Sequence, residues 1–244
     1  MRGKCVFSTT VRKCGVFAAT NCNLDACGRD NTGSYLTIYF VKNIVILISG
    51  AGSNMAAIVK AAHQEAWSKK WGVKVAAVIS NKPQASGLTW LQEHPEFANI
   101  KTEVIDHTLF ESREAFDQSL MAQIDVHAPK LVVLAGFMRI LTPAFVAHYQ
   151  GRLINIHPSL LPAFAGMNTH QRAIDAGSKF AGATVHQVSV EVDQGQILAQ
   201  AVVPVLEDDT AKTLAARVLT QEHLIFPAAV AEFFKTQAVP RPTK

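Results

Sequence analysis

An amide and an imidazole two residues apart form the first pair in this 244-residue chain that could do chemistry. Asn155 and His157 lie in the run L-I-N-I-H at residues 153–157, whose apolar members indicate a buried strand. Side chains two apart on a strand share a face, so both polar groups should point the same way. The amide can donate a hydrogen bond to a developing oxyanion, and the imidazole can move a proton. An isolated Asn-x-His is more often a core histidine beside a turn asparagine, so the context must decide.

A second candidate for chemistry is the small, polar turn at residues 49–54, S-G-A-G-S-N. It follows a β-branched apolar run at residues 43–48 and precedes a pattern of helical spacing. Glycines at such a turn let the backbone approach an anion, and the helix N-terminus supplies N–H donors, which predicts a phosphate site. The turn is not a P-loop, and it lacks the third glycine of a dinucleotide site. The alternative is a tight turn capped by Ser53 or Asn54.

The elements that must position these groups alternate along the chain. Strands are predicted at residues 43–48, 73–79, 102–105, 131–135 and 153–157, with helical patterns between them. This order predicts a Rossmann-like α/β fold with a mostly parallel sheet of about seven strands, flanked by helices. Ligands bind at the carboxyl ends of the strands in such sheets.

The pattern changes after residue 157. A helix is predicted at residues 169–176, and strands at 183–188 and 197–205 follow with only a short connection between them. That spacing predicts antiparallel pairing of the C-terminal strands. The connection contains Asp193, two residues before Gly195, where aspartate is a common turn residue. A last helix is expected from about residue 210 to residue 234.

Composition bounds the class of protein. Hydrophobic residues make up 49% of the chain and charged residues 17%, so a large core is expected. No apolar run reaches the roughly 18 residues that cross a membrane. Residues 1–42 hold six of the 23 basic and two of the 19 acidic residues, which leaves 17 of each sign in residues 43–244. This neutral body argues against nucleic-acid binding, and the lack of a long apolar run argues against a membrane partner.

Residues 1–41 are predicted to be an irregular extension outside the fold. They show no sustained periodicity, and they contain all four cysteines, whose spacings match no paired C-x-x-C site. The first 24 residues lack acids, as transit peptides do. We prefer the interpretation that the start is misassigned and that Val41 is the true start. The body needs no disulfide, which is typical of a cytoplasmic protein.

Six strings, in this order and spacing, carry a resemblance that covers residues 43–235. The chain resembles the folate-dependent formyltransferases, and among them the family that formylates glycinamide ribonucleotide in purine (IMP) biosynthesis. The strings are S-G-A-G-S-N (49–54), S-R-E-A-F-D (112–117), L-A-G-F-M-R-I-L (134–141), N-I-H-P-S-L-L-P (155–162), V-D-Q-G-Q-I-L (192–198) and T-Q-E-H (220–223).

The resemblance implies a single formyltransferase domain at residues 42–244. It implies transfer of the formyl group of 10-formyltetrahydrofolate, a co-substrate, to the substrate amine through a tetrahedral intermediate, with no metal. It implies a catalytic group of Asn155, His157 and Asp193. The implied contacts to glycinamide ribonucleotide are Gly52, Ser53, Asn54 and Glu222. The implied folate contacts are Arg113, Met138, Arg139, Ile140, Leu141, Asn155, Ser189, Val190, Glu191, Val192 and Asp193. Asn168 departs from the pattern, because relatives commonly have histidine there.

The residue types suit the implied reaction. Asn155 and a protonated His157 can donate to the oxyanion, and a carboxylate such as Asp193 near His157 would favour the imidazolium and orient a water for proton relay. The partners are then small molecules, and the chain is expected to be a monomer or weak homodimer.

Three alternatives remain. A formyltetrahydrofolate deformylase would carry an N-terminal regulatory domain, for which the extension is too short. A methionyl-tRNA formyltransferase would carry an added C-terminal domain of roughly a hundred residues. A non-catalytic nucleotide-binding module would not need Asn155, His157 and Asp193 together.

Overall fold

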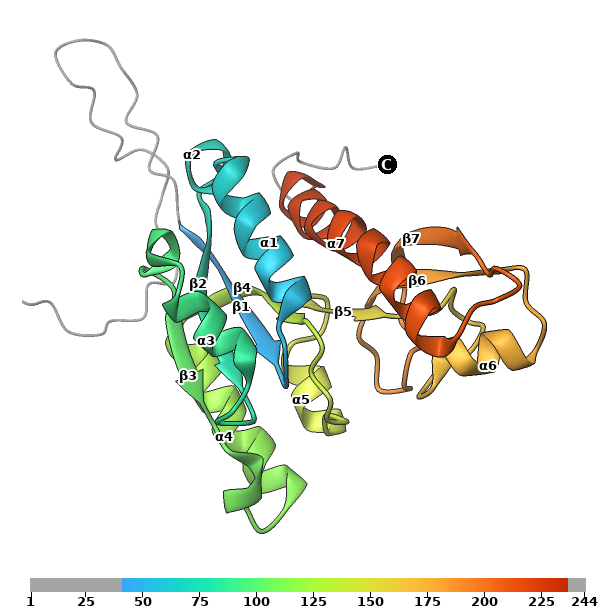
Figure 1. Ribbon diagram of the computed structural model, residues 1–244. Coiled ribbons are helices and arrows are strands. Elements are labelled where there is room, and N and C mark those ends of the chain that lie inside the picture. The colour runs from blue at the N-terminus through green and yellow to red at the C-terminus, as the bar shows by residue number, and fades with distance from the viewer. Residues whose placement is uncertain (1–40, 237–244) are drawn as a thin grey trace, which may run out of the picture. The chain divides into compact units, whose positions relative to one another are not determined.

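The computed structural model describes residues 41–236, so the predictions for residues 1–40 lie outside the described part. Within that range the chain forms a seven-stranded sheet in the order β3-β2-β1-β4-β5-β6-β7 (Figure 1). The strands are β1 Lys42–Ile48, β2 Val73–Ser80, β3 Lys101–Val104, β4 Pro129–Leu134, β5 Leu153–His157, β6 Phe180–Gln187 and β7 Ile197–Pro204.

The sheet is parallel from β3 to β5 and antiparallel from β5 to β7. The β1 strand shows why the parallel half is so apolar, because its residues 44–48 are 0% exposed. Ile44, Ile46 and Ile48 pack on one face of the sheet, whereas Val45 and Leu47 pack on the other. Both faces are therefore covered, as parallel sheets require. The predicted fold class is confirmed, including the antiparallel C-terminal strands.

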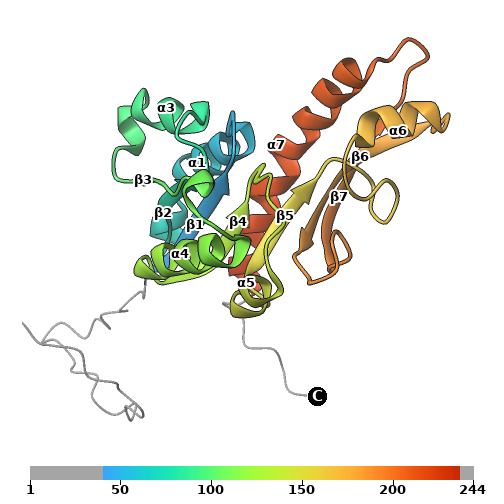
Figure 2. The same cartoon turned by 90° about the horizontal axis from the view of Figure 1, so that it is seen from below.

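Helices cover both faces of this sheet. They are α1 Ser53–Gln64, α2 Trp67–Trp71, α3 Ser86–Gln92, α4 Arg113–Val126, α5 Pro143–His148, α6 Thr169–Asp175 and α7 Ala211–Thr236. Figure 2 shows α1 and α7 above the sheet and α4 and α5 below it. None of the helices within residues 41–236 is long and apolar enough to cross a bilayer.

Two helices begin at a side-chain cap, whereas α1 does not. Ser112 caps α4 by accepting from Ala115 N, and Thr142 caps α5 before Pro143. The alternative that Ser53 or Asn54 caps α1 is wrong, because the capping position is Gly52, at φ +67° and without a side-chain bond. Helix α2 was not predicted, since a five-residue helix is too short to show a period.

Candidate active site

A cavity of about 410 Å³ lies at the carboxyl ends of β4 and β5, beside β6. Its position agrees with the rule that ligands bind where parallel strands end. It is lined by ten of the residues singled out in the sequence, namely Met138, Arg139, Ile140, Leu141, Asn155, His157, Ser189, Val190, Val192 and Asp193. Apolar residues dominate the remaining walls, as in most small-molecule sites.

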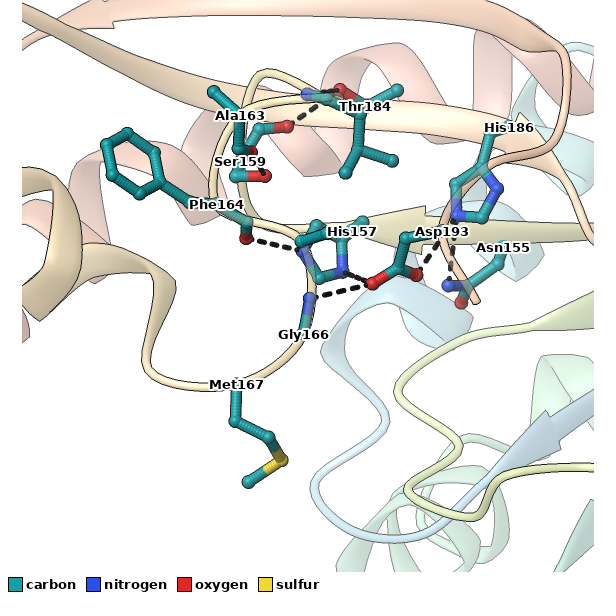
Figure 3. Close-up of polar contacts among 12 residues, drawn as sticks. Asn155, His157, Ser159, Ala163, Phe164, Gly166, Met167, Thr184, His186 and Asp193 are labelled. Carbon is teal, nitrogen blue, oxygen red and sulfur yellow. Dashed lines mark hydrogen bonds and ion pairs between the residues drawn. The ribbon is translucent and has the colours of Figure 1, made fainter. Parts of the chain in front are cut away.

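His157, at the end of β5, has an acceptor facing each ring nitrogen. Nε2 lies 3.2 Å from the carbonyl oxygen of Phe164, and Nδ1 lies 3.4 Å from Oδ2 of Asp193 (Figure 3). The ring is buried, with 7% of the residue exposed. Each ring nitrogen therefore faces an acceptor when it carries a proton.

The loop after β5 holds the Phe164 carbonyl in place through a chain of bonds to β6. Thr184 Oγ1 donates to the carbonyl of Ser159 at 2.7 Å and accepts from Leu161 N at 3.0 Å. Ser159 Oγ in turn donates to the carbonyl of Ala163 at 2.6 Å. Buried polar groups that satisfy one another in this way rigidify their surroundings.

Asp193 reaches this centre from the loop between β6 and β7. Its backbone has φ +56°, in the left-handed region that aspartate tolerates better than most residues. Its Oδ2 accepts a bond from Gly166 N at 2.9 Å and faces His157, while Oδ1 lies 3.8 Å from Nε2 of His186. Figure 3 shows the carboxylate between the two histidines. The aspartate is thus a turn residue whose side chain also completes the cluster.

His186 belongs to this cluster, although sequence reasoning missed it. In the antiparallel register of β5 and β6, Asn155 pairs with His186 and His157 pairs with Thr184. His186 Nδ1 donates to the carbonyl of Gln187 at 2.9 Å, and its Nε2 lies 3.3 Å from Nδ2 of Asn155. Burial lowers the pKa of His186, which leaves the ring neutral and able to accept from the amide. One amide hydrogen of Asn155 is thereby engaged, and the second can point into the cavity.

Comparison with known proteins places this geometry in a family. A model of the formyl transferase family matches residues 42–230, most of the chain. The chain belongs to the formyl transferase family. It is 49% identical over 191 residues to the phosphoribosylglycinamide formyltransferase of Escherichia coli, covering 78% of this chain and 86% of that one.

Two further comparisons extend the match. The crystal structure of a phosphoribosylglycinamide formyltransferase from Brucella melitensis superposes with a TM-score of 0.72 at 48% identity, covering 80% of this chain and 96% of that chain. The trifunctional purine biosynthetic protein adenosine-3 of Homo sapiens is 43% identical over 77% of this chain, which spans only 18% of that protein. The resemblance stated from the six strings is therefore confirmed.

Two of the residues predicted to contact the substrate lie together, and neither is among the residues that line the cavity. Asn54, in the first turn of α1, donates from Nδ2 to Oε2 of Glu222 on α7 at 2.6 Å, and both residues are buried. Burial raises the pKa of the Glu222 carboxyl, while the Asn54 bond and the charge of His157 act in the opposite direction. Gly52 and Ser53 adjoin this pair at the start of α1, so the four residues surround one helix end.

The raised pKa predicts a pH-dependent cost of folding at Glu222. The native state holds this proton more tightly than the unfolded chain, so the free energy of unfolding falls as pH rises from 4.5 through the native pKa. Glu222→Gln keeps an acceptor for Asn54 and removes the charge. We expect the variant to melt at a higher temperature than the wild type at pH 8, with the difference vanishing near pH 4. Thermal melts across this range test it, and a less stable variant at pH 8 would contradict it.

Of three other positions noted in the sequence, two lie outside the cavity lining and one lies within it. Arg113 is exposed at the start of α4, and Glu191 is exposed in the β6–β7 loop, and neither lines the cavity. Their proposed contacts to folate stay predictions. Asn168 does line the cavity, at φ +56°, a conformation that asparagine adopts readily. Among residues 41–236, no three His, Cys, Asp or Glu side chains are grouped so as to hold a metal.

Proposed function

We propose that this formyl transferase moves the formyl group of 10-formyltetrahydrofolate to the amine of glycinamide ribonucleotide. The observation that carries the proposal is the cluster of Asn155, His157 and Asp193 at one wall of an apolar cavity. The names of the relatives support the choice of acceptor. The reactants are small molecules; a cytoplasmic location and a monomer or weak homodimer stay predictions.

In the proposed reaction the neutral amine attacks the formyl carbon. A C–N bond forms and the carbonyl oxygen becomes an oxyanion, which accepts bonds from Asn155 Nδ2 and from His157. The 3.4 Å contact of His157 Nδ1 with Asp193 is longer than an ordinary hydrogen bond, so this N–H can be shared with the oxyanion. The attacking nitrogen then loses a proton, the bond to the folate nitrogen breaks, and that nitrogen gains a proton. Asp193 is placed to orient a water that relays it.

The two reactants fit different sides of the centre. Exposed apolar side chains at the cavity, among them Met138, Ile140, Val190 and Val192, offer contacts for the flat rings of a folate. The helix end at Gly52 and Ser53, with Glu222 beside it, offers N–H donors to a phosphate and an acceptor to sugar hydroxyls or an amine. The formyl carbon would then lie between them, near His157.

A turnover assay separates the candidate functions. The full chain is incubated with 10-formyltetrahydrofolate, with and without glycinamide ribonucleotide, and release of tetrahydrofolate is followed. We expect release only when the ribonucleotide is present. Release without it would favour a deformylase, and binding without release would favour a nucleotide-binding module.

The phosphate contact is best tested at Ser53. Gly52 is a poor test site, because a Cβ there would lie 2.9 Å from Cα of Gly87 and φ is +67°, so any side chain strains the fold. We expect Ser53→Ala to raise the KM for glycinamide ribonucleotide roughly 10-fold, the effect of losing one bond to a charged group. The KM for 10-formyltetrahydrofolate should stay unchanged. Steady-state kinetics measure both, and an equal rise in the two KM values would remove Ser53 from the phosphate site.

A further inference from the structure

The loop after β4 contributes two highly exposed apolar side chains to the cavity lining. Met138 is 75% exposed and Ile140 is 60% exposed, yet both line the cavity. We call residues 138–141 the folate-facing loop, a name that rests on the function proposed above. Leu141 packs against the core, but Met138 and Ile140 are too exposed to fix the loop by packing, so its backbone contacts matter for its conformation.

The first end of the folate-facing loop is held by Ser49. The backbone N–H of Met138 donates to Ser49 Oγ at 2.8 Å, and that hydroxyl donates to Oδ1 of Asn81 at 2.6 Å. Ser49 and Asn81 directly follow the neighbouring strands β1 and β2, and they are only 5% and 2% exposed. Asn81 is fixed in turn, because its carbonyl oxygen accepts from His107 Nδ1 at 2.8 Å.

The second end is held by Asp117 of α4. Its Oδ2 accepts a bond from the backbone N–H of Thr142 at 2.7 Å, and the residue is 1% exposed. The preceding residue, Phe116, lies under the middle of the loop, with the guanidinium carbon of Arg139 4.8 Å from its ring centroid. Adjacent residues of α4 therefore contact the middle of the loop and the residue that follows it.

The cost of this arrangement indicates a role beyond stability. Seven side-chain atoms of the described residues are buried without a hydrogen-bond partner, and two of them, the second oxygen of Asp117 and Nε of Arg139, belong to the contacts of this loop. Unpaired buried polar atoms destabilise a fold. Their occurrence at one loop of the cavity fits a site where pre-organisation is kept at the expense of stability.

We propose that Ser49 and Asp117 are positioning residues that hold the folate-facing loop in its binding conformation before folate arrives. A loop that is already ordered spares the ligand the entropy of ordering it. Releasing either end lowers the fraction of molecules that can bind, and the apparent affinity falls by that fraction. The effect should be larger for folate than for the ribonucleotide, because both bonds lead to the loop, whereas at the ribonucleotide site Ser49 only opens the turn that precedes Ser53.

The test uses two pairs of matched variants. Ser49→Ala removes the bond to Met138. Ser80→Ala is its control, because Ser80 is equally buried at the end of β2 but bonds only the backbone N–H and carbonyl of Lys82, away from the cavity. Asp117→Ala removes the acceptor for Thr142, whereas Asp117→Asn keeps an acceptor oxygen there and should rescue function.

We expect Ser49→Ala and Asp117→Ala to raise the KM for 10-formyltetrahydrofolate roughly 5- to 10-fold, the effect of one hydrogen bond. The KM for glycinamide ribonucleotide should stay the same in Asp117→Ala and change less than the folate KM in Ser49→Ala, and Ser80→Ala and Asp117→Asn should behave as the wild type. Equal KM changes for both substrates, or a matching folate effect in Ser80→Ala, would overturn the proposal.

Hydrogen exchange of the ligand-free protein separates this proposal from the proposed function. The amides of Met138 and Thr142 should be protected in the wild type and in Ser80→Ala. Met138 should lose protection in Ser49→Ala, and Thr142 in Asp117→Ala. Unchanged protection would show that these bonds do not hold the loop, even if the wild type transfers formyl groups. If the variants lost protection but the wild type transferred no formyl group, the bonds would still hold the loop, and the assignment of the loop to folate would be overturned instead.

Discussion

His157→Ala is expected to lower kcat by about 10²–10⁴-fold, the usual contribution of a positioned acid or base. The KM values should change little, because the proposed bonds to the oxyanion form only in the transition state. Asp193→Ala should act through the same interaction, since its carboxylate lies 3.4 Å from Nδ1 of His157. The double variant should then be little worse than the worse single variant. Steady-state kinetics of the three variants measure this coupling.

A second histidine–carboxylate pair in the chain supplies the control. His127 Nε2 lies 2.9 Å from Oε1 of Glu103, and neither residue lines the cavity. His127→Ala should therefore leave kcat unchanged and affect only the melting temperature. Fully additive losses in His157→Ala and Asp193→Ala would reduce Asp193 to a turn residue and leave His157 to act with another partner.

Asn155→Ala is expected to lower kcat by about 10²–10³-fold, the effect of removing one donor from an oxyanion site. The KM values should again be nearly unchanged, because the amide gains its partner as the charge develops. His186 Nε2 orients the amide before the substrate binds, so the wild type has a pre-positioned donor that the variant lacks. Asn155→Asp should be as inactive as Asn155→Ala, because a carboxylate fills the same volume but cannot donate.

Asn43 is the matched control for this substitution. Its Nδ2 donates to the carbonyl of His127 at 2.6 Å, near the amino end of β1 and away from the cavity. Asn43→Ala should cost stability and spare kcat. If Asn155→Ala raised KM and left kcat intact, the amide would bind the ground state, and the oxyanion role would pass to His157 alone.

The parts of the fold that repeat a local pattern could be predicted from the sequence. The apolar runs of β1 and β5, the cap at Ser112 and the Thr142-Pro143 helix start all depend on neighbours in the chain. The common face of Asn155 and His157 follows from the two-residue period of a strand. The cavity at the carboxyl ends of the strands follows from the βα order.

The rest depends on contacts between distant segments. His186 meets Asn155 only because of the register of β5 against β6, and the alternation within each strand fixes the face of a residue but not which residue stands opposite it. Asn54 meets Glu222 across 168 positions of sequence. Arg113 follows from the resemblance alone; it is exposed and does not line the cavity, and its contact to folate stays a prediction. Gly52 serves close packing against Gly87 as well as any role toward phosphate.

The register of β5 against β6 sets the neighbours of both Asn155 and His157. Asn155 faces His186 and His157 faces Thr184, so the donor and the proton carrier take their supports from the same two-residue step of one strand. A surface connection such as that between α6 and β6 tolerates a change in length without moving either pair. A single residue inserted within β6 could not be absorbed in this way. It would set Val185 or Gln187 opposite Asn155 and withdraw the support of His157 in the same slip, so activity would be lost in one step.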